Sequence, residues 1–236
     1  MLVHNPCTTA VEYQASTVPH CFELLKGAFT QEERELVTRH RLASANAAYD
    51  EATAEAARAA SWKALEEARA AGKVRFIGVS NYPVRLMKAM DAYADVLPAV
   101  NQLELHPRFS SPALRALAAE RGFVLTGYGS GNSVAIENSP VISAIAKAHG
   151  ESPLAIVLRW TLQRGVSVVP RTANPAHLAD NLRVAVAAAK GESALSADEL
   201  AKLDALDQAH PYYWHPLPLL PPSSPPDVGA GLTPLI

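Results

Sequence analysis

Short apolar runs alternate with amphipathic stretches along most of the chain after Ser61. The apolar runs are typical of buried parallel strands, and the stretches between them repeat apolar residues at the spacing of one helix face. We predict strands over residues 2–4, 74–80, 99–105, 124–128 and 166–170. Strands that alternate with helices in this way predict βαβ units, and therefore an α/β fold with a parallel sheet.

The amphipathic stretches carry recognisable end signals. Gly72 and Gly122 follow apolar periods and are suited to close a helix, and Ser111 is suited to cap one. Ser196 and Glu199 have the spacing of a capping box. The predicted helices cover residues 61–72, 83–94, 111–122, 141–150, 152–165, 174–185 and 196–207.

Two segments lie outside this regular pattern. Residues 31–60 are rich in Ala, Glu and Arg but poor in long apolar side chains, which predicts one or two exposed helices or a partly ordered segment rather than core. We therefore expect one folded region, 1–210, with an atypical Ala/Glu-rich helical insertion over 8–60, followed by a Pro-rich tail over 211–236. The HPYYWHP run at the start of the tail suits a substrate-side loop and an irregular chain equally well.

Composition narrows the class of protein. The 236 residues carry a net charge of −2, so no electrostatic footprint for nucleic acid or an anionic membrane is expected. Two cysteines are too few for a disulfide framework, and no apolar run reaches the length of a membrane span. Without a signal-peptide pattern at the start, the sequence predicts a cytoplasmic globular protein. No group of His, Cys, Asp and Glu has metal-ligand spacing, so no metal is expected.

Polar residues follow several of the predicted strands directly. In a (β/α) barrel, the carboxyl ends of the strands are where active sites are built. No G-x-G-x-x-G or P-loop run follows any strand, which argues against a Rossmann or flavodoxin-like domain. The polar residues at strand ends are Ser80, Asn81, Gln102, Glu104, Tyr128, Arg171 and Thr172.

Four motifs together resemble the aldo-keto reductases. They are GKVRFIGVSNY, VNQLELHP, LRWTLQRGVSVVPRTANPAHLADN and LSADELAKLDAL, and the resemblance covers roughly residues 61–210. The opening MLVHNP is similar to the fourth strand of that family, which ends in His followed shortly by Pro. The resemblance implies a (β/α)8 TIM-type barrel that is incomplete here, with about five of eight strands and without its N-terminal part. It also implies NADPH-dependent reduction of a small-molecule carbonyl, an aldehyde or a ketone, to an alcohol.

The resemblance assigns residues to the nicotinamide end of the cofactor, NADP(H). Ser80, Asn81 and Gln102 match the residues that hydrogen-bond the carboxamide, and Tyr128 matches the aromatic residue on which the ring stacks. His4 matches the catalytic histidine that orients the substrate carbonyl. Hydride transfer needs such restraints, because the donor carbon must lie about 3–3.5 Å from the carbonyl carbon.

The resemblance also assigns residues to the adenosine end. Arg171 and Thr172 match the basic and hydroxyl pair that binds the 2′-phosphate of NADPH, a pairing that suits phosphate chemically. His177 stands where many members of the family have an Arg on the same phosphate. Asp180 and Asn181 match the pair near the adenine.

One departure from the pattern of the family leaves two functional hypotheses open. The family's general acid is a Tyr assisted by a Lys and an Asp, all from units before the fourth strand, and the resemblance assigns none of them in this sequence. The first hypothesis is therefore an aldo-keto-reductase-like enzyme with weakened activity. The alternative is a non-catalytic remnant that binds NADP(H) or a protein partner, or the product of a truncated gene model. Exposed barrel edges would favour a homodimer.

Overall fold

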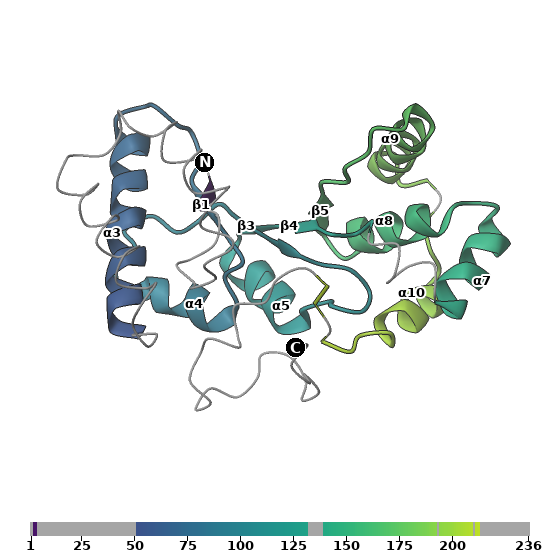
Figure 1. Cartoon of the computed structure of the whole chain (residues 1–236), viewed down its shortest axis with the longest axis horizontal. Helices are drawn as coiled ribbons and strands as arrows, with labels where there is room; N and C mark the ends of the chain where they lie inside the picture. Colours follow the sequence, from purple (N-terminus) through teal and green to yellow (C-terminus); the bar gives the residue numbers. More distant parts are fainter. Residues whose placement is uncertain (1, 4–50, 132–138, 193, 210, 213–236) are drawn as a thin grey trace. The chain divides into compact units, whose positions relative to one another are not determined.

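The computed structural model describes residues 2–3, 51–131, 139–192, 194–209 and 211–212 (Figure 1). These residues form two compact units, one ending at Val100 and the other running from Asn101 to the end of the described chain. All five predicted strands are present among them, each within one or a few residues of its expected range. The strand prediction is therefore confirmed.

The described part of the first unit contains two parallel strands and three helical segments. Strand β1 (Leu2–Val3) pairs in parallel with β2 (Gly78–Ser80), with Val3 opposite Val79. The strand β2 is shorter than predicted, because the chain before Gly78 is irregular. The helical segments are α3 (Glu51–Ala70), α4 (Val84–Ala89) and the 3-10 helix η2 (Met90–Ala92).

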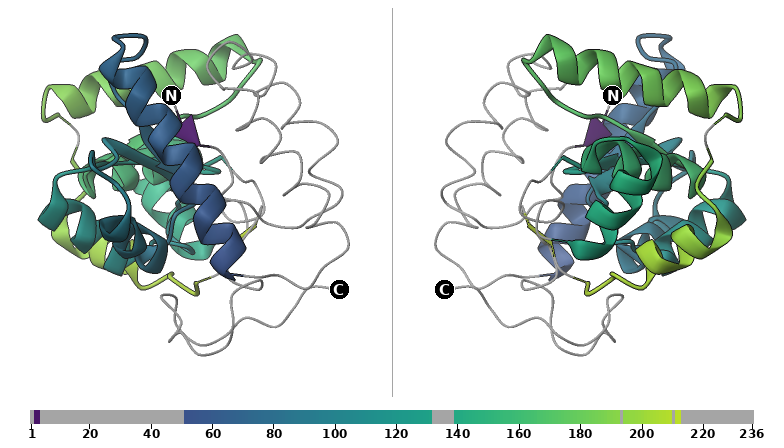
Figure 2. Two further views of the ribbon diagram at one scale, coloured as in Figure 1. Left: turned by 90° about the vertical axis from the view of Figure 1, so that its left-hand side faces the viewer. Right: turned by 90° about the vertical axis from the view of Figure 1, so that its right-hand side faces the viewer.

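Helix α3 starts earlier than the apolar pattern predicts. It begins at Glu51 rather than near Ser61 and is a single unbroken helix (Figure 2). The Ala- and Glu-rich residues before Ser61 have high helix propensity, so they extend the amphipathic helix that follows them. Arg58, in the segment expected to stay out of the core, is only 4% exposed, so that expectation is wrong at this residue.

Two side chains of α3 bind the backbone of one residue, Val96, in the chain after η2. The Trp62 Nε1 donates to the Val96 carbonyl at 3.0 Å, and the Val96 N–H donates to Glu66 Oε1 at 2.7 Å. Residues four apart lie on the same face of a helix, so the N–H and the carbonyl of Val96 are both bound from one face of α3. Trp62 is also among the most buried side chains of the described residues, so this contact fixes α3 against the core of its unit.

The second unit is built on three neighbouring strands in the order β3 (Val100–Glu104), β4 (Val124–Tyr128) and β5 (Val166–Val168). Strands β4 and β5 pair in parallel. The Leu105 N–H donates to the Tyr128 carbonyl at 3.1 Å just beyond the end of β3. A Cβ added at Gly127 would lie 3.3 Å from the Leu105 Cβ, so a glycine here permits the close approach of the two strands.

Five helices are present among the described residues of the second unit, and their caps agree largely with the sequence. They are α5 (Pro112–Arg121), α7 (Pro140–His149), α8 (Pro153–Gln163), α9 (Pro175–Ala189) and α10 (Ala197–Asp204). The capping box of Ser196 and Glu199 is confirmed, and Gly122 closes α5 in the left-handed conformation. Ser111 occupies the N-cap of α5, but its φ of 45° takes its side chain away from the helix, so the predicted side-chain cap is wrong.

Helix α8 is buried on all sides. Every residue from Ala155 to Thr161 is buried, and the indole N–H of Trp160 donates to Asp204 Oδ1 at 2.9 Å. A helix that is apolar all round is expected at the centre of a unit, which is where α8 lies. Among the described helices none alone is long and apolar enough to cross a membrane, although the bent pair of α7 and α8 would be by length and composition.

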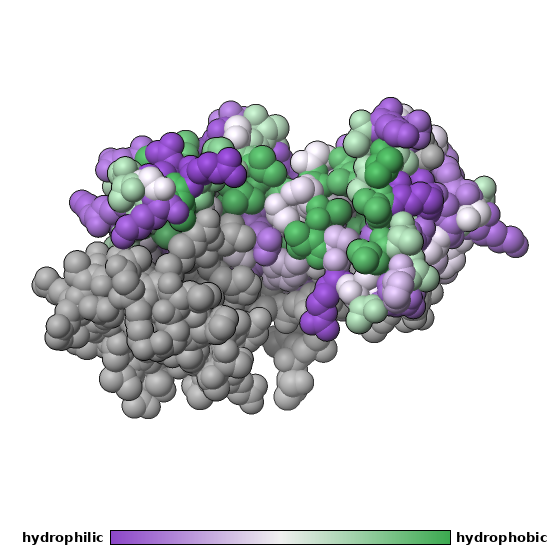
Figure 3. Space-filling model, turned by 90° about the horizontal axis from the view of Figure 1, so that it is seen from above, coloured by the Kyte–Doolittle hydropathy of each residue, from purple (hydrophilic) through white to green (hydrophobic). Residues whose placement is uncertain are grey.

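Helix α9 has apolar residues on two faces. Val184 and Ala187 are buried, whereas Leu178 and Leu182 are each 63% exposed and Val186 is 44% exposed. Figure 3 looks down on this face and shows hydrophobic side chains in a strip over α9. Strand β5 is also the last in the order of the described strands. A homodimer through such exposed surfaces stays a prediction.

The contrast between α8 and α9 can be tested with one kind of substitution. We expect Leu158→Ala, at a position 1% exposed, to lower the free energy of unfolding by about 2–5 kcal/mol through a cavity in the core. The matched Leu182→Ala, at the exposed position on α9, should change it by less than about 0.5 kcal/mol. Denaturant unfolding of both variants measures this difference, and equal losses would contradict the burial described for the two helices.

Candidate cofactor-binding site

The first unit carries two of the expected carboxamide ligands. Ser80 is the last residue of β2 and is fully buried, and its Oγ has no hydrogen-bond partner among the described residues. Asn81 follows directly, 6% exposed, with a φ of 60° that Asn tolerates better than most residues. A buried hydroxyl without a partner is costly, so the Ser80 Oγ is suited to receive a polar group of a ligand. His4 lies outside the described residues.

The second unit places Gln102 and Tyr128 on neighbouring strands. Tyr128 is the last residue of β4, Gln102 is the middle residue of β3, and both are half-buried. Strands β3 and β4 are neighbours, and the Leu105–Tyr128 hydrogen bond joins their ends, so the structure places the two predicted residues on adjacent strands, with Gln102 three residues before the position level with Tyr128. An amide and an aromatic ring on adjacent strands can bind and stack a flat polar ring.

The predicted phosphate ligands gather before and within the first turn of α9. Arg171 and Thr172 follow β5, and His177 lies in the first turn of the helix. The Thr172 Oγ1 accepts from the Asn174 N–H at 3.0 Å, and Asn174 caps the helix. Arg171 and His177 are exposed. The positive end of a helix dipole beside two basic side chains suits an anion.

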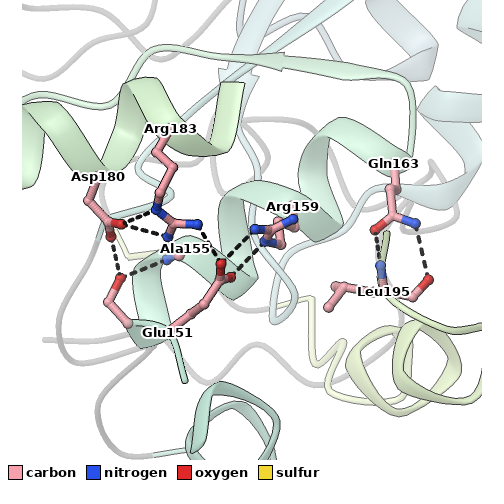
Figure 4. A network of polar contacts seen from close by, with 8 residues as sticks. Glu151, Ala155, Arg159, Gln163, Asp180, Arg183 and Leu195 are labelled. Carbon is pink, nitrogen blue, oxygen red and sulfur yellow. Dashed lines mark hydrogen bonds and ion pairs between the residues drawn. The ribbon is translucent and has the colours of Figure 1, made fainter. Parts of the chain in front are cut away.

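Asp180 has a structural role that the sequence did not reveal. Its carboxylate accepts from Ser152 Oγ at 2.8 Å and from Arg183 Nη2 at 2.7 Å (Figure 4). Burial raises the pKa of Asp180, but the hydrogen bonds from Arg183 and Ser152 outweigh it, so the pKa lies below its ordinary value. The carboxylate is thus already held by two donors, and the contact expected between Asp180, Asn181 and the adenine stays a prediction.

Glu151 is the centre of the same network. It accepts from Arg159 Nε and Nη2 at 2.7 and 2.6 Å, and from Arg183 Nη1 at 2.6 Å (Figure 4). Arg159 is only 3% exposed, so its charge is buried on α8 and compensated chiefly by this carboxylate. The network joins the turn before α8 to α9. It therefore fixes the helix whose first turn carries the basic residues.

A second buried polar cluster lies at the carboxyl end of β3. Glu104 and His106 are each 1% exposed, and Glu104 Oε1 lies 2.9 Å from His106 Nε2. The same oxygen accepts from the Tyr212 N–H at 2.6 Å, and Arg108 Nη1 donates to the Tyr212 hydroxyl at 2.6 Å. Sequence reasoning placed Glu104 at a strand end but gave it no role. A carboxylate between Leu103 and Leu105 was the signal that pointed to this cluster.

The chain before Tyr212 is bound to the same region. The Gln208 N–H donates to the Arg108 carbonyl at 3.1 Å, and Ser110 Oγ donates to the Asp207 carboxylate in a short contact. We call the described part of residues 207–212 the strap. The first residues of the expected Pro-rich tail, Pro211 and Tyr212, are therefore half-buried on the second unit rather than free of it.

The family of this chain follows from its similarity to known proteins. A model of the Aldo/keto reductase family matches residues 33–208, which is most of the chain. The chain therefore belongs to the aldo/keto reductase family, as its motifs indicated. The match begins inside the segment 8–60, so residues 33–60 belong to the matched region as well.

Curated relatives and solved structures agree with this assignment. The chain is 35% identical over 178 residues to the NAD(P)H-dependent D-xylose reductase of Scheffersomyces stipitis, covering 67% of this chain and 54% of that protein. It is 38% identical over 160 residues to morphine 6-dehydrogenase of Pseudomonas putida, covering 62% and 52%. The crystal structure of Gox0644 in its apo form matches with a TM-score of 0.59 and 34% identity, covering 66% of this chain and 55% of that one.

The comparisons also define the extent of the fold. The chain spans about half the length of the curated relatives it matches. The described strands and helices are accordingly part of a (β/α)8 barrel, and the expected incomplete barrel is confirmed. The polar strand ends described above therefore lie at the face of the fold where barrel enzymes build their sites.

The Glu151 network predicts a pH-dependent stability. The Arg159 hydrogen bonds, assisted by those from Arg183, hold the pKa of Glu151 below its usual 4.5. Because the folded-state pKa is depressed, this stabilisation is complete above pH 4.5 and is lost as the pH falls through the folded-state value. We expect Glu151→Gln to lower the free energy of unfolding by about 3 kcal/mol at neutral pH, since it leaves the Arg159 charge poorly compensated.

Unfolding curves of wild type and Glu151→Gln over a series of pH values test this account. The difference between the two proteins should shrink as the pH falls below 4.5. The exposed Glu120→Gln serves as the control and should change stability by less than about 0.5 kcal/mol at every pH. If the difference in the free energy of unfolding between wild type and Glu151→Gln stayed constant into strong acid, the charge of the Glu151 carboxylate would not be its cause.

Proposed function

We propose that this protein acts as an NADP(H)-dependent aldo-keto reductase that reduces an aldehyde or ketone to an alcohol. The observation that carries the proposal is the basic start of α9 in a member of this family, where Arg171 and Thr172 precede the N-cap and the exposed His177 lies in the first turn. A phosphate ester with two negative charges fits such a place. NADPH carries one such ester, the 2′-phosphate, which NADH lacks. The names of the matched xylose reductase and morphine dehydrogenase support the oxidoreductase class.

The nicotinamide end of the cofactor would be held by strand-end residues. The orphaned, buried Ser80 Oγ fits a carboxamide, which offers both a donor and an acceptor. Asn81 and Gln102 would complete these hydrogen bonds, and the ring would stack on Tyr128. When bound, the cofactor supplies the hydride, and the protein supplies only orientation and electrostatics.

The proposed reaction also needs a general acid that gives a proton to the carbonyl oxygen. His4 would orient the carbonyl, but the family's Tyr, Lys and Asp have no assigned counterparts in this sequence. General acid catalysis contributes roughly 10²–10⁴-fold, so we expect turnover slower than that of a complete family member by about this factor. Binding of NADP(H) without turnover is the second candidate function. It is favoured because no residue of this sequence is assigned as the family's Tyr, Lys or Asp.

Binding of the cofactor is the first test of the proposal. We expect the purified chain to bind NADPH more tightly than NADH, and Arg171→Ala to weaken NADPH binding about tenfold through the loss of a charge-assisted phosphate contact. Lys190→Ala is the matched control, because it removes an exposed cation at the opposite end of α9. Fluorescence titration of NADPH measures both variants. Equal weakening by the two substitutions would indicate general charge attraction rather than a site.

Turnover is measured separately with NADPH and a panel of aldehydes and ketones. We expect slow loss of NADPH absorbance that depends on both the carbonyl compound and the chain. Turnover at the rate of complete family members would contradict the account of the unassigned general acid. Tight NADPH binding with no turnover on any carbonyl would favour the non-catalytic alternative.

A further inference from the structure

Glu104 lies on the same side of β3 as the predicted carboxamide ligand. Side chains two residues apart point to the same face of a strand, so Gln102 and Glu104 share a face, and Leu103 points to the other. Gln102 is half-buried and Glu104 almost completely buried. A carboxylate in that position needs strong partners, because an uncompensated buried charge is costly.

The strap supplies one of those partners. The Tyr212 N–H lies 2.6 Å from Glu104 Oε1, and the His106 ring nitrogen lies 2.9 Å from the same oxygen. The rings of His106 and Tyr212 are also in contact, with centroids 5.3 Å apart. Releasing the strap would therefore leave a buried carboxylate with fewer donors, which ties the position of the strap to the position of the β3 end.

The end of β3 is bound in turn to the end of β4. The Leu105 N–H donates to the Tyr128 carbonyl at 3.1 Å, and Ser130 Oγ donates to the Leu105 carbonyl at 3.3 Å. Residue 105 is thus bound at both its N–H and its carbonyl by the segment that carries Tyr128. A displacement of Glu104 would be transmitted directly to β3 and β4, the strands that carry Gln102 and Tyr128.

We propose that Glu104 is a positioning residue that couples the strap, through Tyr212, to the two strand ends expected to hold the nicotinamide ring. This inference rests on the proposed function for the identity of the ligand. The proposal is a thermodynamic linkage. The strap is bound most firmly when β3 and β4 have the geometry that binds the nicotinamide ring, and release of the strap therefore weakens binding of the ring. The phosphate end at the start of α9 is outside this linkage.

The test compares variants of Glu104 and Tyr212 with two probes. NADPH reports on both ends of the site, whereas 2′,5′-ADP contains only the adenosine and phosphate end. Hydrogen exchange of the peptide containing residues 207–212 reports on the strap without any ligand. Glu104→Ala removes the acceptor, Glu104→Gln keeps its shape and one acceptor oxygen, and Tyr212→Phe removes only the hydroxyl bound by Arg108.

Ser196→Ala is the stability control. It removes the capping box of α10, which lowers stability without changing a contact of the strap, Gln102 or Tyr128. We expect Glu104→Ala to speed strap exchange and to weaken NADPH binding about tenfold, with 2′,5′-ADP binding unchanged. Glu104→Gln should restore part of the affinity, and Tyr212→Phe should show a smaller effect in the same direction. Ser196→Ala should leave both affinities unchanged.

The outcomes separate the coupling from the function on which it rests. A freed strap with unchanged NADPH affinity would overturn the coupling, as would equal weakening of NADPH and 2′,5′-ADP, which indicates general structural damage. If Glu104→Ala does not fold, Glu104→Gln and Tyr212→Phe decide the question by the same two probes. Failure of the wild-type chain to bind either probe would overturn the proposed function, and the coupling with it.

Discussion

The second unit depends on the burial of the central two turns of α8. One helix whose residues are buried from Ala155 to Thr161 gives α7, α9 and β5 a common surface to pack against. Such burial forces the single charge on that stretch, Arg159, to find a carboxylate, and Glu151 at the start of the same helix supplies it. The ion pair is thus a consequence of the hydrophobic core, because an unpaired guanidinium there would be too costly.

The network around Glu151 extends this constraint from the core to the surface. Arg183 on α9 shares the Glu151 carboxylate with Arg159 and also binds Asp180. The orientation of α9 is therefore set by charges that belong to α8 and its preceding turn. The helix whose first turn carries His177 is held to the second unit by this arrangement.

Two carboxylates of the second unit, those of the buried Glu104 and the partly buried Glu151, serve comparable purposes at different places. Glu151 compensates arginines and holds a helix, whereas Glu104 binds a ring nitrogen and a backbone N–H and holds the strap. In both cases the carboxylate joins segments far apart in the sequence. Placement of polar groups at strand ends is typical of barrel enzymes, and such groups need supporting residues that hold their positions.

The sequence by itself determined the elements and the family. Alternating apolar runs located all five described strands, and the caps at Gly122 and Ser196 were readable because they depend on neighbouring residues only. The tertiary structure decided what depends on distant residues. Examples are the early start of α3, the engagement of Asp180 by Arg183 and Ser152, and the contact of Glu104 with Tyr212, 108 residues away. Local propensity and periodicity extend over a few turns, whereas the partner of a buried charge is chosen by the packing of the whole unit.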